Sequence, residues 1–233
     1  MSTHVNAFGQ PIGAPVPGWQ PRPRPPRTVM TGRFCRIEPL DIERHADALF
    51  AANMLDRDGR NWTYLGVGPF EAFGPYRTWL ETSCRGDDPL FHTIVDYERG
   101  PVGLGAYLRI EPPVGVIEIG HLNFSPLLQR HPAATEAMYL MMRRVFDELG
   151  YRRYEWKCDS FNGPSRAAAE RLGFRFEGIF RQAVVYKGRS RDTAWLSIID
   201  SEWPALKQAF ERWLAPDNFD AEGKQRRRLQ ELR

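Results

Sequence analysis

The feature that most constrains the fold is an apolar segment that leads through a short loop into a helix and then into a second apolar segment. Residues 116–124 (VIEIGHLNF) read as a strand, and residues 133–149 carry apolar side chains at helical spacing. Residues 151–159 (YRRYEWKCD) follow as a second strand. A strand, a helix and a strand in this order form a crossover that makes the two strands parallel. Ligands bind at the carboxyl ends of such strands.

The segments on either side of this crossover also alternate between patterns typical of strands and patterns typical of helices. Strands are expected at residues 33–40, in three runs between residues 89 and 124, and in a long hairpin that turns at Lys187 and Gly188. Helices are expected at residues 41–55, 71–84, 162–173 and 202–214. We therefore predict an α/β (α+β) domain with a mixed, mostly antiparallel sheet flanked by helices.

The two ends of the chain differ in composition from the part between them. Residues 11–27 hold seven prolines, which prevent a helix or a central strand and favour an extended arm. We divide the chain into a proline-rich arm (1–30), one domain (31–215) and a charged tail (216–233). The arm is interpreted as a strap over the domain, as a subunit-swapping arm of a homodimer, or as a disordered leader. The tail is interpreted as a short helix or a frayed end.

The overall composition argues against several functions. A net charge of +3 is too small to indicate nucleic-acid binding, although the RRR cluster of the tail keeps that role as a minor alternative. No apolar run reaches the roughly 20 residues that span a bilayer, and the first residues do not resemble a signal peptide. We therefore expect no membrane association and a cytoplasmic protein. Cys35, Cys84 and Cys158 are far apart and odd in number, which predicts reduced thiols and no disulfide or metal site.

The loop before the central helix has the features of an anion site. A helix mouth presents free N–H groups and the positive end of the helix dipole. Pro132 suits the first helical position because its missing N–H would be unpaired anyway, so the amides that follow it are expected to remain free. Many helix mouths bind nothing, so a structural loop is the alternative. The residues expected to supply amides, donors or charge are Gln129, Arg130, Ala133, Ala134 and Thr135.

A second helix mouth follows the second strand. Asn162 is placed to cap a helix whose first turn contains Pro164 and Ser165, so the serine hydroxyl is expected to point out of the mouth. The alternative for Ser165 is a hydroxyl bonded to the backbone. Because the two mouths follow adjacent strands, we expect them to face one cleft.

The segments LQRHPAATEAMYLMMRRVF and DSFNGPSRAAAERLGFRFEGIFR resemble the Gcn5-related N-acetyltransferase (GNAT) superfamily, and within it the group of the ribosomal-protein N-terminal acetyltransferases. The resemblance covers about residues 33–200. It implies a GNAT fold of about seven strands, splayed between strands four and five. Acetyl-coenzyme A (acetyl-CoA) would lie in the opening, with its pyrophosphate on the first helix mouth. The family pattern Q/R-x-x-G-x-G/A falls on Gln129, Pro132 and Ala134, so proline replaces the first glycine.

The resemblance also implies roles for single residues. The family asparagine that matches Asn162 contacts the pantetheine arm, and the serine that matches Ser165 protonates the leaving thiolate. A backbone N–H of the splayed strand, at Leu122, Asn123 or Phe124, would bind the developing oxyanion.

The sequence leaves several candidates for the general base. Acyl transfer needs a neutral amine, so a base within hydrogen-bond reach is expected. The position of the family glutamate is Val184, which cannot accept a proton. Glu118 is the preferred substitute because burial would raise its pKa, and a buried structural ion pair is the alternative. His121 is a second candidate, but in a regular strand it would face the side opposite to Glu118, so only one of the two could face the cleft unless a bulge intervenes. Asp192 is a third candidate.

In the superfamily that the chain resembles, the loop between the first two helices borders the acceptor site, so we expect aromatic residues of this loop, together with one from the hairpin, to line that site. The alternative for the loop residues is a plug at the domain edge. These residues are Trp62, Tyr64, Phe70 and Tyr186. The leading hypothesis is an acetyl-CoA-dependent N-acetyltransferase of a primary amine, either a protein N-terminus or a small molecule. A non-catalytic acyl-CoA-binding module is the second hypothesis, which Val184 and Pro132 favour.

Overall fold

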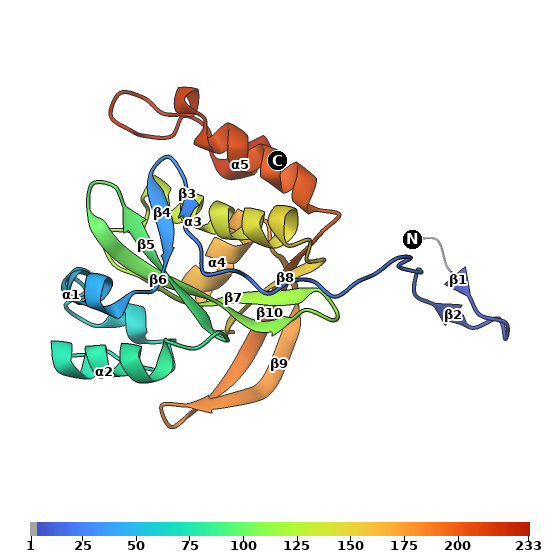
Figure 1. The fold of residues 1–233 in the computed structure, drawn as a ribbon, viewed down its shortest axis with the longest axis horizontal. Coiled ribbons are helices and arrows are strands. Elements are labelled where there is room, and N and C mark those ends of the chain that lie inside the picture. The colour runs from blue at the N-terminus through green and yellow to red at the C-terminus, as the bar shows by residue number, and fades with distance from the viewer. Residues whose placement is uncertain (1–3) are drawn as a thin grey trace.

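The computed structural model describes residues 4–233 and places a central sheet between two groups of helices (Figure 1). The main sheet has eight strands in the order β3-β4-β5-β6-β7-β8-β10-β9. Within it β7 and β8 are parallel, and all other neighbours are antiparallel. The strands are β1 (His4–Val5), β2 (Pro11–Ile12), β3 (Met30–Thr31), β4 (Cys35–Pro39), β5 (Leu90–Asp96), β6 (Gly100–Glu111), β7 (Val116–Phe124), β8 (Arg153–Asp159), β9 (Arg175–Tyr186) and β10 (Arg189–Ile199).

This architecture confirms the predicted fold class. The parallel pair is the crossover predicted from the sequence, and the remaining strands form the predicted antiparallel part of the sheet. The sheet has one strand more than the about seven expected. The additional strand is β3, a two-residue segment that pairs with β4 at the sheet edge.

The helices begin and end where the local chemistry favours it. The Asp41 carboxylate accepts a hydrogen bond from the Arg44 amide at 3.2 Å, and Pro132 opens the central helix. Gly173 ends α4 with φ = +107°, and a side chain there would collide with Leu206. The helices are α1 (Ile42–Asn53), η1 (Arg60–Trp62), α2 (Phe73–Ser83), α3 (Pro132–Arg143), the π-helical turn η2 (Arg144–Glu148), α4 (Gly163–Leu172), α5 (Trp203–Leu214), η3 (Pro216–Asn218) and η4 (Leu229–Leu232).

The helices cover the two faces of the sheet unequally. α3, α4 and α5 contribute to the larger core cluster, to which Ile117 and Ile119 of β7 belong. α1 and α2 pack on the opposite face through a smaller cluster that includes Phe91 of β5 and Leu104 of β6. Figure 1 shows β9 and β10 extending beyond α1 and α2. The second face of β7, β8 and β10 therefore lies beside these two helices.

The N-terminal arm has two parts. β1 and β2 form a small hairpin that lies away from the domain (Figure 1). From Trp19 onward the arm contacts the domain, since the Trp19 indole donates to the Pro113 carbonyl at 2.8 Å. Further along, the Arg144 guanidinium donates to the Thr28 carbonyl at 2.8 Å. The second part of the arm is therefore a strap.

The segment after α5 folds back onto the domain. Leu229 is 1% exposed and belongs to the larger core cluster. Asn218 fixes the preceding turn, because its side-chain oxygen accepts from the Arg227 amide at 2.9 Å and its nitrogen donates to the Trp213 carbonyl at 2.9 Å. The segment therefore packs as a short helical turn and does not fray.

Shortening Leu229 tests how much this packing contributes. Leu229→Ala removes buried apolar volume, so we expect the free energy of unfolding to fall by about 2 kcal/mol. Leu55→Ala is the matched control because Leu55 is 54% exposed, and it should change stability by less than about 0.5 kcal/mol. Urea unfolding followed by circular dichroism measures both. Equal stabilities of the two variants would contradict the packing role.

The cysteines are free and buried, as predicted. Burial raises the pKa of the Cys84 thiol to about 12, so this thiol is a packing group at neutral pH. No helix among residues 4–233 is long and apolar enough to cross a membrane. The same residues contain no group of three or more acidic, cysteine or histidine side chains arranged to hold a metal ion.

Candidate active site

The sheet splits between β7 and β8. Their parallel pairing runs from Val116 and Arg153 to Ile119 and Trp156, and then ends. Beyond that point β7 continues along β6 to Phe124, while β8 continues along β10 to Asp159. The two strands therefore separate toward their carboxyl ends, as the resemblance implies. α3 follows β7 and α4 follows β8, so the two predicted helix mouths flank one opening.

A β-bulge shapes the β7 side of the opening. Gly120 pairs with Ala106 and Asn123 with Leu104, so two residues of β7 oppose a single residue of β6. His121, within the bulge, has φ = +49°. Its ring lies 5.1 Å from that of Phe91, on the face covered by α1 and α2.

The bulge places the two candidate bases of β7 on the same face. Ile117 and Ile119 belong to the core on the α3 face, so Glu118 between them points to the α1 and α2 face, where His121 also lies. A regular strand would have separated the two side chains. Both are therefore available to one site.

Glu118 is 3% exposed and lies between two cations. Its Oε2 accepts a hydrogen bond from Arg109 Nη1 at 2.7 Å and lies 2.9 Å from Lys157 Nζ. Lys157 also approaches Glu155 at 2.8 Å and stacks 3.7 Å from the centre of the Trp195 ring. Burial raises the pKa of Glu118 above its ordinary value, although Lys157 and Arg109 act in the opposite direction. Glu118 therefore shows both the raised pKa expected of a general base and the buried ion pair expected of a structural residue.

His121 differs from Glu118 in its exposure. His121 is exposed to solvent at one side. Partial burial of its ring, and to a smaller extent the charge of Arg109, lowers the pKa of His121. The ring is therefore neutral near pH 7 and can accept a proton.

Asp192 and Val184, the other two positions weighed for a base, both lie in the β9 and β10 hairpin. Asp192 Oδ1 accepts a hydrogen bond from the Gln182 amide at 2.6 Å, where Gln182 has φ = +50°. This carboxylate fixes a bulge in β9, where the pairing of β9 with β10 shifts register. Val184 lies on β9 opposite Arg191 and is 40% exposed.

Side chains in the loop before α3 bind this loop to neighbouring segments. Gln129 Nε2 donates to Asn61 Oδ1 and to the Phe124 carbonyl, both at 2.8 Å, and so ties the mouth to the α1–α2 loop. Arg130 is exposed and has φ = +60°, and its amide has no protein acceptor within residues 4–233.

The tautomer of His131 decides whether the Ala133 amide is free. His131 Nε2 lies 2.8 Å from Arg99 Nη1, and because a guanidinium only donates, Nε2 must accept. A neutral ring then carries its proton on Nδ1, which lies 3.3 Å from Asp96 Oδ2. Burial, followed by the charge of Arg99, lowers the pKa of His131 and favours this neutral form. The 3.4 Å approach of the Ala133 amide to Nδ1 is therefore not a hydrogen bond. The Ala133 amide is then left without an acceptor, but Ala133 is 0% exposed, so this amide is buried.

The neighbouring positions correct part of the prediction. The Ala134 amide donates to the His131 carbonyl at 3.0 Å, because the first turn of α3 is tight, so it is not free. The Thr135 hydroxyl accepts a hydrogen bond from Arg171 Nη2 at 2.8 Å. Arg171 of α4 therefore places a positive charge beside the mouth, which the sequence analysis did not anticipate.

The split strand itself leaves polar groups unpaired. Asn123 is 2% exposed, and neither atom of its side-chain amide has a partner within residues 4–233. The buried Ser125 hydroxyl, just after β7, also lacks a hydrogen-bond partner within these residues. In an antiparallel pair only alternate amides bond to the neighbour, so some amides of Leu122, Asn123 and Phe124 point away from β6. These groups fit a polar ligand in the opening.

The predicted cap of α4 is present, whereas the Ser165 hydroxyl contacts a residue of the larger core cluster, Trp156. Asn162 caps the helix, with Oδ1 accepting from the Ser165 amide at 3.1 Å. The Ser165 hydroxyl accepts a hydrogen bond from the Trp156 indole at 3.0 Å. An indole N–H only donates, so the hydroxyl proton of Ser165 is left for another acceptor.

The predicted acceptor residues fall into two groups. The Tyr64 hydroxyl donates to the Phe161 carbonyl at 3.1 Å, and the Tyr186 hydroxyl donates to Asp159 Oδ2 at 2.9 Å. These two tyrosines meet at the end of β8. Burial, aided by Asp159, raises the pKa of Tyr186 to about 12, so it stays protonated.

Trp62 and Phe70 lie elsewhere. Trp62 is 3% exposed, and the rings of both residues pack with centroids 5.3 Å apart in the smaller core cluster. Lys187, at the hairpin turn, donates to the Trp62 carbonyl at 2.7 Å and joins the hairpin to the α1–α2 loop. Lys187 was read from the sequence only as a turn residue. Its contact depends on a residue 125 positions away.

Comparison with known proteins identifies the family. A family model for the acetyltransferase (GNAT) domain matches residues 35–175, which is more than half of the chain. The chain therefore belongs to the GNAT acetyltransferase family. This match includes β7, β8, both helix mouths and the bulge.

Individual relatives agree with this assignment. The chain is similar to a GCN5-related N-acetyltransferase from Brucella melitensis, with 52% identity, a TM-score of 0.91, and coverage of 93% of this chain and 99% of that chain. An uncharacterized N-acetyltransferase, YnaD of Bacillus subtilis (strain 168), is 29% identical over 37% of this chain and 50% of its own length, so the match spans half of that protein. The Microcin C7 self immunity acetyltransferase MccE, solved in complex with acetyl-CoA and AMP, shares the fold at 19% identity, with a TM-score of 0.64 over 76% of this chain and 98% of that chain.

Proposed function

We propose that the protein is an acetyl-CoA-dependent N-acetyltransferase that acts on a primary amine, either a protein N-terminus or a small molecule. The observation that carries this proposal is the opening between β7 and β8, flanked by the mouths of α3 and α4. Free thiol released from acetyl-CoA in the presence of a panel of amines tests it. Turnover that depends on the amine is the expected result.

The residues around the opening suit acetyl-CoA, which supplies the acetyl group as a reactive thioester. The free amide of Arg130, together with the positive charge of Arg171, suits its pyrophosphate. The unpaired groups of Asn123 and the free amides of β7 suit the polar atoms of the pantetheine arm and the thioester.

The variant Asn162→Asp distinguishes the helix-capping role of Asn162 from its proposed hydrogen bond to the pantetheine arm. Aspartate caps a helix as well as asparagine does, but it cannot donate a hydrogen bond when ionised. We expect unchanged stability and about a tenfold rise in KM for acetyl-CoA, equivalent to about 1.4 kcal/mol for one lost hydrogen bond. Asn162→Ala should also lose about 1 kcal/mol of stability. A KM equal to that of the unaltered protein in Asn162→Asp would remove the pantetheine role.

The acceptor amine is proposed to enter on the face that carries Glu118 and His121, between the α1–α2 loop and the hairpin. Tyr64, Tyr186 and Asp159 lie at this end of β8. Asp159 is 4% exposed and accepts from the Phe161 amide and the Tyr186 hydroxyl, so it holds Tyr186 in place, and a base removes one proton from the amine before acyl transfer. The resemblance to the ribosomal-protein N-terminal acetyltransferases supports a protein N-terminus as the acceptor, and peptides in the amine panel test this.

A non-catalytic acyl-CoA-binding module is the second candidate. The ion pairs of Glu118 with Arg109 and Lys157 favour it, because a carboxylate held by two cations is a weaker base. Calorimetry that detects acetyl-CoA binding, combined with no thiol release on a broad amine panel, would select this candidate.

A further inference from the structure

Strand β6 bulges beside Glu118 of β7. The pairing of the two strands shifts register between Leu108, which lies opposite Glu118, and Glu111, so β6 has one residue more than β7 over this stretch. Arg109, within the bulge, has φ = +45°, a left-handed conformation that long side chains rarely adopt. The contacts around Arg109 must therefore hold its backbone in this conformation.

Asp88 supplies these contacts. Its two carboxylate oxygens accept hydrogen bonds from the backbone amides of Arg109 and Ile110, at 2.8 and 2.9 Å. β5 pairs with β6 only as far as Leu90 and Tyr107, and beyond that pair Asp88 lies at the register position opposite Arg109. The Asp88 side chain therefore takes the place of the strand backbone that would otherwise bind these amides.

The bulge directs the Arg109 side chain toward Glu118. Arg109 is exposed, and its Nη1 donates to Glu118 Oε2 at 2.7 Å. The other cation at Glu118 is Lys157 of β8, which is shared with Glu155, whereas Arg109 forms its ion pair within residues 4–233 with Glu118 alone. The charge of Arg109 also reaches His121. Without Arg109, the effect of burial on the Glu118 pKa would be opposed by Lys157 alone.

The proline-rich strap contacts the loop that contains Asp88. Its sequence PRPRPPR places Arg24 and Arg27 three positions apart, so both project from one side of a polyproline helix, which has about three residues per turn. Arg27 Nη2 donates to the Gly86 carbonyl and to Asp87 Oδ1, both at 2.8 Å. Arg24 Nη2 donates to the Asp87 carbonyl at 3.1 Å and lies 3.6 Å from Asp88 Oδ2. The two guanidinium groups therefore bind consecutive residues of this loop.

Further contacts fix the strap on either side of these two arginines. The Tyr151 hydroxyl donates to the Pro23 carbonyl at 3.1 Å, and the Arg144 guanidinium donates to the Thr28 carbonyl at 2.8 Å. Tyr151 is 1% exposed and Arg144 is 4% exposed, so both contacts come from the interior of the domain. The strap is therefore held independently of the loop and supports it from outside.

We propose that Asp88 is a positioning residue for Glu118, and that Arg24 and Arg27 of the strap hold Asp88 in place. The contacts run without interruption from the strap to the loop, from Asp88 to the β6 bulge, and from Arg109 to Glu118. Asp88 acts on Glu118 only through Arg109. This role rests on the proposed acetyl transfer, in which Glu118 is the base, because a carboxyl without Arg109 keeps its proton to a higher pH.

Carbon NMR of the glutamate carboxyl groups, without acetyl-CoA, measures the titration of Glu118, whose signal is identified by its loss in Glu118→Gln. Asp88→Ala and Arg109→Met should each raise the pH at which Glu118 titrates by about one pH unit. Loss of the Asp88 charge acting directly through space would lower that pH, so the sign separates the two effects. An unchanged or lowered titration in Asp88→Ala would overturn the proposal.

Combining the two substitutions tests whether Asp88 acts through Arg109. Asp88→Ala added to Arg109→Met should leave the titration of Glu118 as it is in Arg109→Met, because the side chain that Asp88 positions is already absent. Shifts that add in the double variant would show that Asp88 acts by another route and would overturn the proposal. Melting temperatures show whether each variant is folded.

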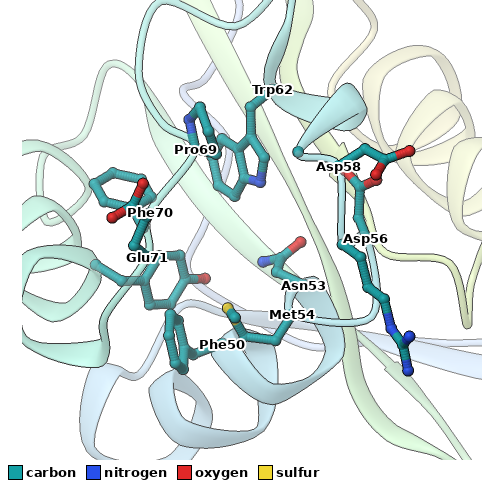
Figure 2. A pocket seen from close by; sticks show the side chains of 12 residues that line it. Phe50, Asn53, Met54, Asp56, Asp58, Trp62, Pro69, Phe70 and Glu71 are labelled. Carbon is teal, nitrogen blue, oxygen red and sulfur yellow. The ribbon is translucent and has the colours of Figure 1, made fainter.

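Asp58→Ala is the matched control for Asp88→Ala. Asp58 also lies in a loop and pairs with an arginine, Arg60, at 2.9 Å. It lines a pocket of about 280 Å³ between the end of α1, the loop that follows it, and the residues before α2 (Figure 2). No residue of β6 or β7 belongs to this lining. Glu118 should therefore titrate as in the unaltered protein, and a shift equal to that of Asp88→Ala would count against a specific role of Asp88.

Variants of the strap test its part in the proposal. Arg24→Ala combined with Arg27→Ala should raise the pH at which Glu118 titrates, and should have no effect when added to Arg109→Met, which excludes a direct charge effect. Arg22→Ala is the control, because Arg22 belongs to the same strap but stacks over Trp19 at 4.3 Å. Equal titrations in the Arg24 and Arg27 variant and the unaltered protein would overturn the role of the strap. Both arginines are partly exposed, so this variant also tests the contacts if Asp88→Ala does not fold.

The pH dependence of turnover connects these contacts with the reaction. The acid limb of kcat/KM for the amine should move to higher pH in Asp88→Ala by the same amount as the NMR titration, with KM for acetyl-CoA unchanged. His121 alone would also produce a limb, since burial and the Arg109 charge lower its pKa, so the limb is compared with the titration of Glu118 itself. If that titration moves and the limb does not, Glu118 is not the base, although Asp88 still positions Arg109. If no amine is acetylated, the NMR titration alone decides the positioning role.

Discussion

Replacing Ser165 by alanine is expected to lower kcat about 100-fold while leaving KM for acetyl-CoA unchanged. The hydroxyl accepts from the Trp156 indole, so its own proton is free to move to the leaving thiolate. General acid catalysis contributes about 10² to 10⁴ in rate, and a thiolate is a good leaving group, which places the effect near the lower limit. Steady-state kinetics with thiol detection measures both constants.

A matched variant separates this role from the structural one. Ser165→Ala also leaves the Trp156 N–H without its acceptor, which costs about 1–3 kcal/mol of stability. Trp156→Phe removes the same hydrogen bond but keeps the hydroxyl, so it should retain most of the activity if it stays folded. A similar loss of kcat in both variants would show that Ser165 acts only through packing.

The backbone of the site was predictable from the sequence for a physical reason. Apolar periodicity reports which face of an element is buried, and the order of the crossover fixes where two helix mouths meet. Pro132 and Asn162 are local signals, so both helix starts were found. The edge strand β3 was missed because a two-residue strand has no periodicity.

The side-chain arrangement was less predictable because it depends on distant partners. The bulge at His121 arises from the pairing of β7 with β6 and brings His121 to the face of Glu118. The loop aromatics looked alike in the sequence, yet Tyr64 reaches the end of β8 while Trp62 and Phe70 enter a core cluster. Contacts formed only in the folded chain decide such differences.

Replacing Glu118 by glutamine is expected to lower kcat/KM for the amine about 1,000-fold, within the range of a lost general base. The buried carboxyl has a raised pKa, so its deprotonated form disappears at a higher pH than that of an ordinary carboxyl. Activity of the unaltered protein should therefore fall as the pH is lowered through that pKa. The residual activity of Glu118→Gln should lack this decline when both proteins are assayed with the same amine, because titration of the amine affects them equally.

Glu118→Gln also breaks two ion pairs, so its effect needs a control for charge. The double variant Glu118→Gln with Lys157→Met removes one cation together with the carboxylate, and Arg109 remains exposed to solvent on the other side. If Glu118 is the base, the double variant stays inactive although its stability recovers. If Glu118 only balances Lys157, activity returns with stability. In that case His121, neutral and open to solvent on the same face, becomes the base, and His121→Asn should then abolish the pH dependence.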